Sequence, residues 1–372
     1  MHRPGLTGSV REPNFATQGS PGPGRVSLLG KGGNRLGARG VPLPSVTCPA
    51  RPHPVNVGAS WQPGSMRPAI RPGLLPIWRD RDTLQLGIDS RRAIAITGIS
   101  GAAAVIWLLD GSRDREQVVA EADRLGVPRA ATERVLSVLA AAGALVDYPA
   151  GLLRSVPLEL RNTLSSVLAV ASLSGRDSDG GAGLLARRSA TRVAVRGRGL
   201  VATVLADLLT RSGLAALAEP AAGQRGSANA ADLIVLVGHQ SPAQTAELLR
   251  FRQSHLAVSA AEAIGVVGPL VHPGSTACLR CLDLTRVDSD PAWPLVLAQL
   301  AGRSAQPEAC DPVLATAVAA QAAAQVVAFA DRSSLARTTV NGTLELALPA
   351  WQWRRRSWLP HPACICRASA AA

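Results

Sequence analysis

Lysine and aromatic residues are scarce in this 372-residue chain. Lys31 is its only lysine, so arginine supplies nearly all of the positive charge, and 3% of the residues are aromatic. The formal net charge is +13, yet no basic stretch is interleaved with aromatic side chains. Because that combination is typical of nucleic-acid binding, its absence argues against a nucleic acid as the partner.

The sequence also lacks the apolar segments that export and membranes require. It has no positively charged start followed by an apolar run, which predicts no secretory signal and a cytoplasmic location. Its most apolar run, residues 313–330, is rich in alanine and contains two glutamines. A membrane span needs about 20 strongly apolar residues, so this run predicts a buried helix and no membrane contact.

Residues 1–65 have no hydrophobic period and are dense in glycine, proline and arginine. Such a stretch cannot bury enough apolar surface to offset the entropy of ordering it, so it predicts a disordered tail. Seven basic residues stand there against the single acid Glu12, which leaves open a basic tail for an acidic partner. Met66 precedes the first patterned segment, and a start at that residue is the alternative.

Residues 74–150 predict a small module of strands and helices. The patterns place strands at 74–80, 83–89 and 92–99, helices at 100–111, 114–126 and 128–143, and a closing strand at 144–148. This order describes a winged-helix module. Its third helix offers only Arg129 and Arg134, with Glu133 beside them, so it favours protein or peptide binding over a DNA phosphate backbone.

Two helices of this module have a clear apolar face. The second helix is expected to bury Val118, Val119, Ala122 and Leu125, and the third to bury Val135, Leu136 and Leu139. Residues 151–189 follow, with an apolar helix at 161–173 and the linker-like sequence SGRDSDGGAG at 174–183.

Residues 190–372 then alternate between strands and helices. Strands are expected at 191–199, 214–219, 231–239 and once or twice within 255–274, with helices at 200–213 and 241–254 between them. This alternation predicts an α/β domain with a Rossmann-like, doubly wound sheet.

The first turn of this domain fits a nucleotide-binding pattern, G-x-G-x-x-A, at Gly197, Gly199 and Ala202. Its glycines would let the backbone approach a phosphate at the start of the next helix. A ribose-binding acid is expected about 20 residues later, and Glu219 is the sole candidate. Tight packing of the strand on the helix is the alternative role of the glycines.

Four of the six cysteines stand in two close pairs, each after a His-Pro: Cys278 with Cys281, and Cys364 with Cys366. Cys48 and Cys310 are single. With no export signal, thiols should stay reduced, and paired cysteines then favour a metal over disulfides. Four thiolates suit a closed, structural zinc site, so the pairs predict zinc. His272 and His361 are expected to serve turn geometry or a hydrogen bond near the site.

Taken together, these motifs resemble the ThiF-type superfamily of ubiquitin-activating and MoeB-like adenylyltransferases. The resemblance covers about residues 190–366. It rests on the glycine turn, on the C-x2-C followed by LDLTRVDSDPAW, on the apolar helix after CDP (310–312), on the strand NGTLELALP (341–349) and on the terminal HPACIC. It implies ATP binding at the turn, adenylation of the C-terminal carboxylate of a small carrier protein, and zinc held by the four paired cysteines.

The chain lacks charged residues that the superfamily uses for adenylation. The acid pair after the second strand, the arginine-bearing loop and the phosphate-contacting lysine of the family are absent. In the transition state of adenylation, positively charged groups beside the phosphate stabilise its negative charge. These losses therefore argue against ATP binding and catalysis.

A subgroup with the same losses is similar to this chain: the partner proteins of azole-forming cyclodehydratases. They join a winged-helix module that binds a leader peptide at a sheet edge to a ThiF-like domain that keeps zinc. The resemblance implies an edge within residues 74–99 and the helix at 128–143. It predicts a non-catalytic, zinc-stabilised protein that binds a peptide for a modifying enzyme. An active adenylyltransferase and a winged-helix regulator are the alternatives, and a homodimer is left open.

Overall fold

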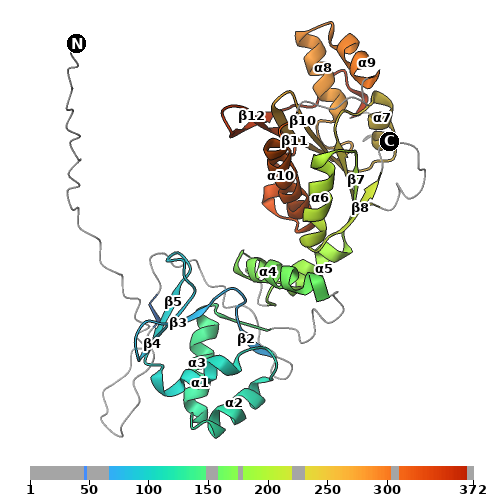
Figure 1. Ribbon diagram of the computed structural model, residues 1–372. Helices are drawn as coiled ribbons and strands as arrows, with labels where there is room; N and C mark the ends of the chain where they lie inside the picture. The colour runs from blue at the N-terminus through green and yellow to red at the C-terminus, as the bar shows by residue number, and fades with distance from the viewer. Residues whose placement is uncertain are drawn as a thin grey trace, which may run out of the picture. The chain divides into compact units, whose positions relative to one another are not determined.

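The computed structural model describes residues 46–47, 67–147, 158–174, 179–219, 231–302 and 310–366 (Figure 1). The chain divides into two compact units. The first comprises Met1–Gly64, Leu74–Leu109 and Arg115–Leu145, and the second comprises Ser65–Gly73, Asp110–Asp114 and Val146–Ala372. The predicted tail, residues 1–65, lies outside the described residues except for 46–47. The predicted division at 74–150, 151–189 and 190–372 differs in its boundaries from these units and stays a prediction.

The first unit contains an antiparallel sheet and three helices. The sheet has the order β1 (Val46–Thr47), β5 (Ile94–Thr97), β4 (Thr83–Leu86) and β3 (Pro76–Trp78). The helices are α1 (Ala103–Leu108), preceded by a 3-10 turn η1 (Ser100–Ala102), then α2 (Arg115–Arg124) and α3 (Arg129–Ala141). The three strands predicted within residues 74–99 and the three helices after them are thus all present, each shorter than expected.

Helices α2 and α3 bury most of the predicted apolar faces. Val118, Val119 and Ala122 of α2 are buried, as are all three predicted residues of α3. The prediction for Leu125 is wrong, because α2 ends at Arg124 and the turn at Gly126 leaves Leu125 54% exposed.

Arg129 at the start of α3 is engaged by carboxylates. Its Nη2 lies 2.8 Å from a carboxylate oxygen of Glu116 in α2, and its Nε lies 3.2 Å from Glu133. Since its guanidinium already has two acidic neighbours, Arg129 is poorly suited to contact a phosphate.

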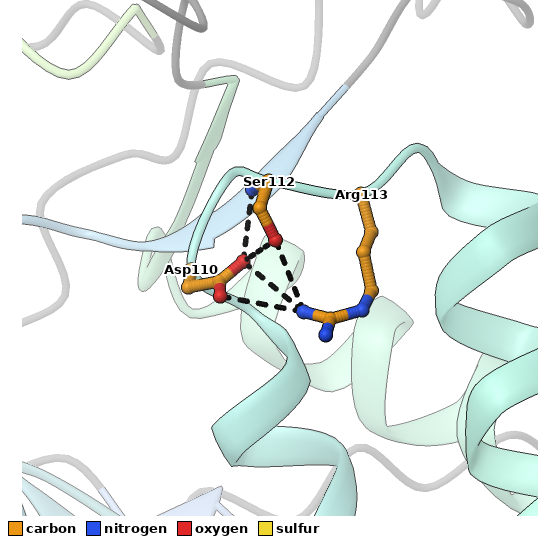
Figure 2. Close-up of polar contacts among 3 residues, drawn as sticks. All are labelled: Asp110, Ser112 and Arg113. Carbon is orange, nitrogen blue, oxygen red and sulfur yellow. Dashed lines mark hydrogen bonds and ion pairs between the residues drawn. The ribbon is translucent and has the colours of Figure 1, made fainter.

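The closing strand predicted at 144–148 is β6 (Leu145–Asp147), and it pairs with β2 (Pro68–Ile70) in a separate two-stranded sheet. A turn at residues 110–113 is fixed against β2, because Ala69 forms a bridge with Asp110 and Gly111 N donates to the carbonyl of Pro68. In this turn the Asp110 carboxylate accepts from Ser112 N at 2.8 Å and lies 3.3 Å from Arg113 Nη1 (Figure 2). These contacts give the turn a structural role.

The second unit is built on a seven-stranded mixed sheet. Its order is β13 (Gln352–Ser357), β12 (Gly342–Ala347), β11 (Ile264–Val271), β10 (His255–Ala261), β9 (Leu233–Val237), β7 (Arg192–Arg196) and β8 (Ala215–Glu219). Strands β10, β9, β7 and β8 are parallel, and β11, β12 and β13 continue the sheet as antiparallel strands. The predicted α/β class is therefore confirmed. β13 was not predicted, because QWRRRS has no apolar alternation and all six residues are exposed.

Helices cover both faces of this sheet. Leu233, Val235 and Val237 of β9 pack on the face covered by α6 (Leu200–Arg211) and α10 (Pro312–Ala330). Ile234 and Leu236 point to the other face, toward α7 (Pro242–Arg250) and α8 (Leu279–Ser289). This alternation follows from the two-residue period of a strand and explains the unbroken apolar run of β9.

Helix α10 begins at an Asp311 N-cap, whose carboxylate accepts from the backbone N–H groups of Val313 and Leu314. Among the described residues it is the one helix long and apolar enough to cross a membrane. It packs in the core of the unit against α6, β10 and β11. The predicted buried helix at 313–330 is therefore confirmed.

Two further helices precede the sheet: α4 (Leu158–Ser174) and α5 (Ala182–Ala190). The predicted linker at 174–183 is only partly correct, because its end forms a turn that starts α5. The Asp179 carboxylate accepts there from the backbone N–H groups of Gly181 and Gly183.

Candidate metal centre

Two loops at one end of the sheet bring the paired cysteines together. Cys278 is the N-cap residue of α8, which places Cys281 in the first turn of that helix. Cys364 and Cys366 follow β13 near the end of the chain. All four side chains are at most 5% exposed and pack with Val271 and Trp358. The two pairs are 83 positions apart in the sequence, and the strands between them bring the start of α8 and the segment after β13 together.

Asn341, which the sequence reasoning missed, holds the two loops in register. Its Oδ1 accepts from the backbone N–H of Ala277 at 2.7 Å, just before the first pair of cysteines. Its carbonyl accepts from the backbone N–H of Trp358 at 2.9 Å, on the segment that leads to the second pair. The positive φ of Asn341, 50°, is a conformation that asparagine tolerates better than most residues.

The geometry of the sulfurs fits a metal ion. The Sγ–Sγ distances are 3.7 Å for Cys278–Cys281, 3.6 Å for Cys278–Cys364 and 3.5 Å for Cys281–Cys366, and the four sulfurs lie within 4.8 Å of one another. A tetrahedron with zinc–sulfur bonds of about 2.3 Å has sulfurs about 3.8 Å apart, close to these values. A disulfide would instead require about 2.05 Å. These four cysteines can therefore hold a metal ion.

The charges in the cluster also favour a cation. The hydrogen bond with Cys278 lowers the pKa of Cys281 to about 4, and the backbone N–H of His361 acts in the same direction. That hydrogen bond and burial raise the pKa of Cys278, while burial raises the pKa of Cys366 to about 12. A divalent ion would stabilise the thiolate form of these cysteines.

Neither histidine of the two His-Pro segments joins the sulfurs. His361 Nδ1 accepts from the backbone N–H of Ala363 at 3.2 Å, and its Nε2 lies 2.8 Å from the Asp288 carboxylate in α8. His272 Nδ1 lies 3.3 Å from Ser254 Oγ, and burial lowers the pKa of this imidazole. His361 therefore shapes the turn before Cys364, as expected.

The two single cysteines are separate from this cluster. Cys310 is half-buried and contacts the carbonyl of Asp311 at 3.5 Å. Cys48 lies outside the described residues.

The predicted nucleotide turn lies between β7 and α6. Gly197 has a φ of 144°, and a Cβ there would come within 2.5 Å of the backbone oxygen of Val237 in β9. Gly199 has a φ of 87° and faces open space, while Ala202 is buried in the first turn of α6. The side chain of Glu219 lies outside the described residues. Gly197 thus fits the packing interpretation, and Gly199 is required by the left-handed turn.

No family model and no curated protein matches the chain. Among solved structures, the heterocyclase TruD matches 80% of this chain at 20% identity, with a TM-score of 0.55. A heterocyclase in complex with substrate and cofactor matches 78% at 17% identity, with a TM-score of 0.54. E. coli MccB with MccA matches 82% of this chain at 14% identity, with a TM-score of 0.49, and the match covers 100% of that MccB chain.

This chain spans 42% and 38% of the length of the two heterocyclases. At these identities the likeness shows a shared fold.

Proposed function

We propose that this chain is a zinc-stabilised, ThiF-like protein without catalysis of its own, which binds a peptide or protein substrate for a modifying enzyme of the cyclodehydratase type. The observation that supports it best is the match to TruD, which extends over 80% of this chain but 42% of that heterocyclase. The rest of TruD has no counterpart in this chain, and in this proposal a partner enzyme would supply it.

The metal centre supports a structural role for the ion. Four thiolates complete the tetrahedral coordination of zinc and leave no position open for water or substrate. Cys278, Cys281, Cys364 and Cys366 would hold the ion, which would fasten the segment after β13 to the start of α8. Zinc in such a site supplies stability rather than Lewis-acid chemistry at a substrate.

The first unit offers a surface for the peptide, which is the role expected of a winged-helix module in this proposal. β3 lies at the edge of its sheet, opposite β1. Around it three large apolar side chains are exposed: Leu75 by 56%, Ile77 by 39% and Trp78 by 41%. An extended peptide can add a strand to such an edge, because the unpaired backbone groups accept it and the apolar side chains pack against it.

Peptide binding is the first prediction. A labelled short peptide encoded in a neighbouring reading frame should bind saturably to the full chain. Trp78→Ala should weaken that binding about tenfold, because a buried aromatic anchor contributes 1–2 kcal/mol or more to an interface. Trp107→Ala is the matched control, since Trp107 is 64% exposed in α1 of the same unit. Equal losses in the two variants, measured by fluorescence anisotropy, would contradict a site at β3.

The absence of adenylation is the second prediction. Labelled ATP should show no saturable binding to the full chain at micromolar concentrations, and the chain should not exchange pyrophosphate into ATP. The reason is that the acids, the arginine-bearing loop and the lysine expected to hold the triphosphate are missing. Saturable ATP binding together with pyrophosphate exchange would establish the adenylyltransferase alternative instead.

A further inference from the structure

A cavity of about 890 Å³ lies in the second unit, between α7, α8, α9 (Trp293–Gly302) and strands β10 and β11. It borders the metal centre, since Ile365 and Cys366 form part of its wall. Gly197, Gly199 and Ala202 do not line it, so it is distinct from the predicted nucleotide turn. Its volume is in the range of about 300–1,000 Å³ that small-molecule sites occupy.

Helix α9 forms an apolar cover over this cavity. Trp293, Leu297 and Leu300 line the cavity from α9, while Leu295 and Val296 on the same helix are 64% and 37% exposed. A helix with apolar residues on both faces gains little by lying on a polar surface. The inner face of α9 is therefore suited to contact an apolar ligand.

The start of α9 is fastened to α8 by three side chains. Trp293 Nε1 donates to Asp283 Oδ1 at 3.3 Å, and Arg286 Nη1 donates to the same oxygen at 3.2 Å. The Arg286 guanidinium also lies 4.9 Å from the centre of the Trp293 ring. These contacts use the one carboxylate among the described residues that line the cavity.

The remaining charge on the cavity wall is positive. Arg250, Arg252, Arg280 and Arg286 all line it, against Asp283 alone. Arg250 stacks on the Phe251 ring at 4.5 Å, with no carboxylate partner among the described residues. Arg280 is exposed and forms no hydrogen bond or ion pair in the part of the chain that the structure describes. An apolar cavity with this charge excess attracts an anion.

We propose that this cavity binds an amphipathic anion, with an apolar body under α9 and a carboxylate or phosphate group at Arg250 and Arg280. Charge complementarity selects an anion, and the leucines and tryptophan of α9 select a body with a hydrocarbon surface. This site is in the second unit and does not depend on peptide binding at β3, so either proposal can fail without the other.

Calorimetry on the full chain tests this site with decanoate and decyl phosphate, each below the concentration at which it forms micelles. At least one anion should bind saturably with one molecule per chain, and which one binds identifies the head group. Decanol and decyltrimethylammonium should bind about tenfold more weakly or not at all, because they lack the negative charge. Equal affinity for decanol and the anions, or no saturable binding of either anion, would overturn the proposal.

Two variants locate the site. Arg280→Glu should weaken anion binding about tenfold and should not change how decanol behaves. Arg187→Glu is its control, since Arg187 is exposed on α5 and does not line the cavity. Leu297→Glu should weaken the binding of every compound that binds the unmodified chain. An unchanged circular dichroism spectrum would show that the fold persists. Equal affinities in Arg280→Glu and Arg187→Glu would place the anion elsewhere.

Discussion

Replacing Cys364 by serine is expected to release the metal ion and to lower the free energy of unfolding by about 4–5 kcal/mol or more, since loss of a metal belongs to the largest class of single-residue effects. Cys364 Sγ lies 3.6 Å from Cys278 Sγ, so its removal leaves three thiols in a buried site that no longer completes a tetrahedron. An ion held by these four cysteines would bind only the folded arrangement, so its binding free energy would add to the free energy of folding.

Elemental analysis of the purified protein checks the metal, and denaturant unfolding checks the stability. Cys310→Ser is the control, because Cys310 is a half-buried cysteine outside the cluster. Cleavage by trypsin at the exposed residues Arg354–Arg356 should also become faster in Cys364→Ser, because the segment that follows β13 is no longer fastened to α8. A metal content equal to that of the unmodified chain would refute the site.

The cysteine cluster could be predicted from the sequence because its signal is local in each half. C-x2-C and C-x-C each present two sulfurs to one ion, and two such pairs supply the four ligands that a closed zinc site takes. What joins the halves could not be predicted. Asn341 bonds to Ala277 and Trp358 through contacts that depend on where β12 lies beside β11, and no sequence pattern reports that position.

The fold could be predicted where burial leaves a pattern of apolar residues in the sequence. It could not be predicted where the side chains lie on the surface. β9 is apolar throughout because both of its faces are covered, and α10 is apolar because it packs in the core. β13 is a strand through pairing with β12 alone, so its six exposed residues carry no alternation. The cavity beneath α9 likewise depends on how three helices meet, which their separate patterns do not encode.

The ion pair between Arg188 in α5 and Asp331 at the end of α10 carries the second large expected effect. Arg188 Nε lies 2.8 Å from Asp331 Oδ1 and Nη2 lies 2.7 Å from Oδ2, while Nη1 donates to the carbonyl of Ser212 at 3.2 Å. The two side chains are 11% and 13% exposed. The pair therefore joins α5 to the ends of α6 and α10, and it is largely buried.

Arg188→Ala is expected to lower the free energy of unfolding by about 3–5 kcal/mol, because it leaves the Asp331 carboxylate buried without its partner. Arg211→Ala is the control: its pair with Asp207 has the same 2.7 Å distance but is 58% and 57% exposed, so its loss should cost about 0.5 kcal/mol or less. The double variant Arg188→Met with Asp331→Leu should be more stable than Arg188→Ala, since it leaves no buried charge. Denaturant unfolding of the three variants measures these differences. If Arg188→Ala costs no more than Arg211→Ala, the buried pair does not hold the three helix ends together.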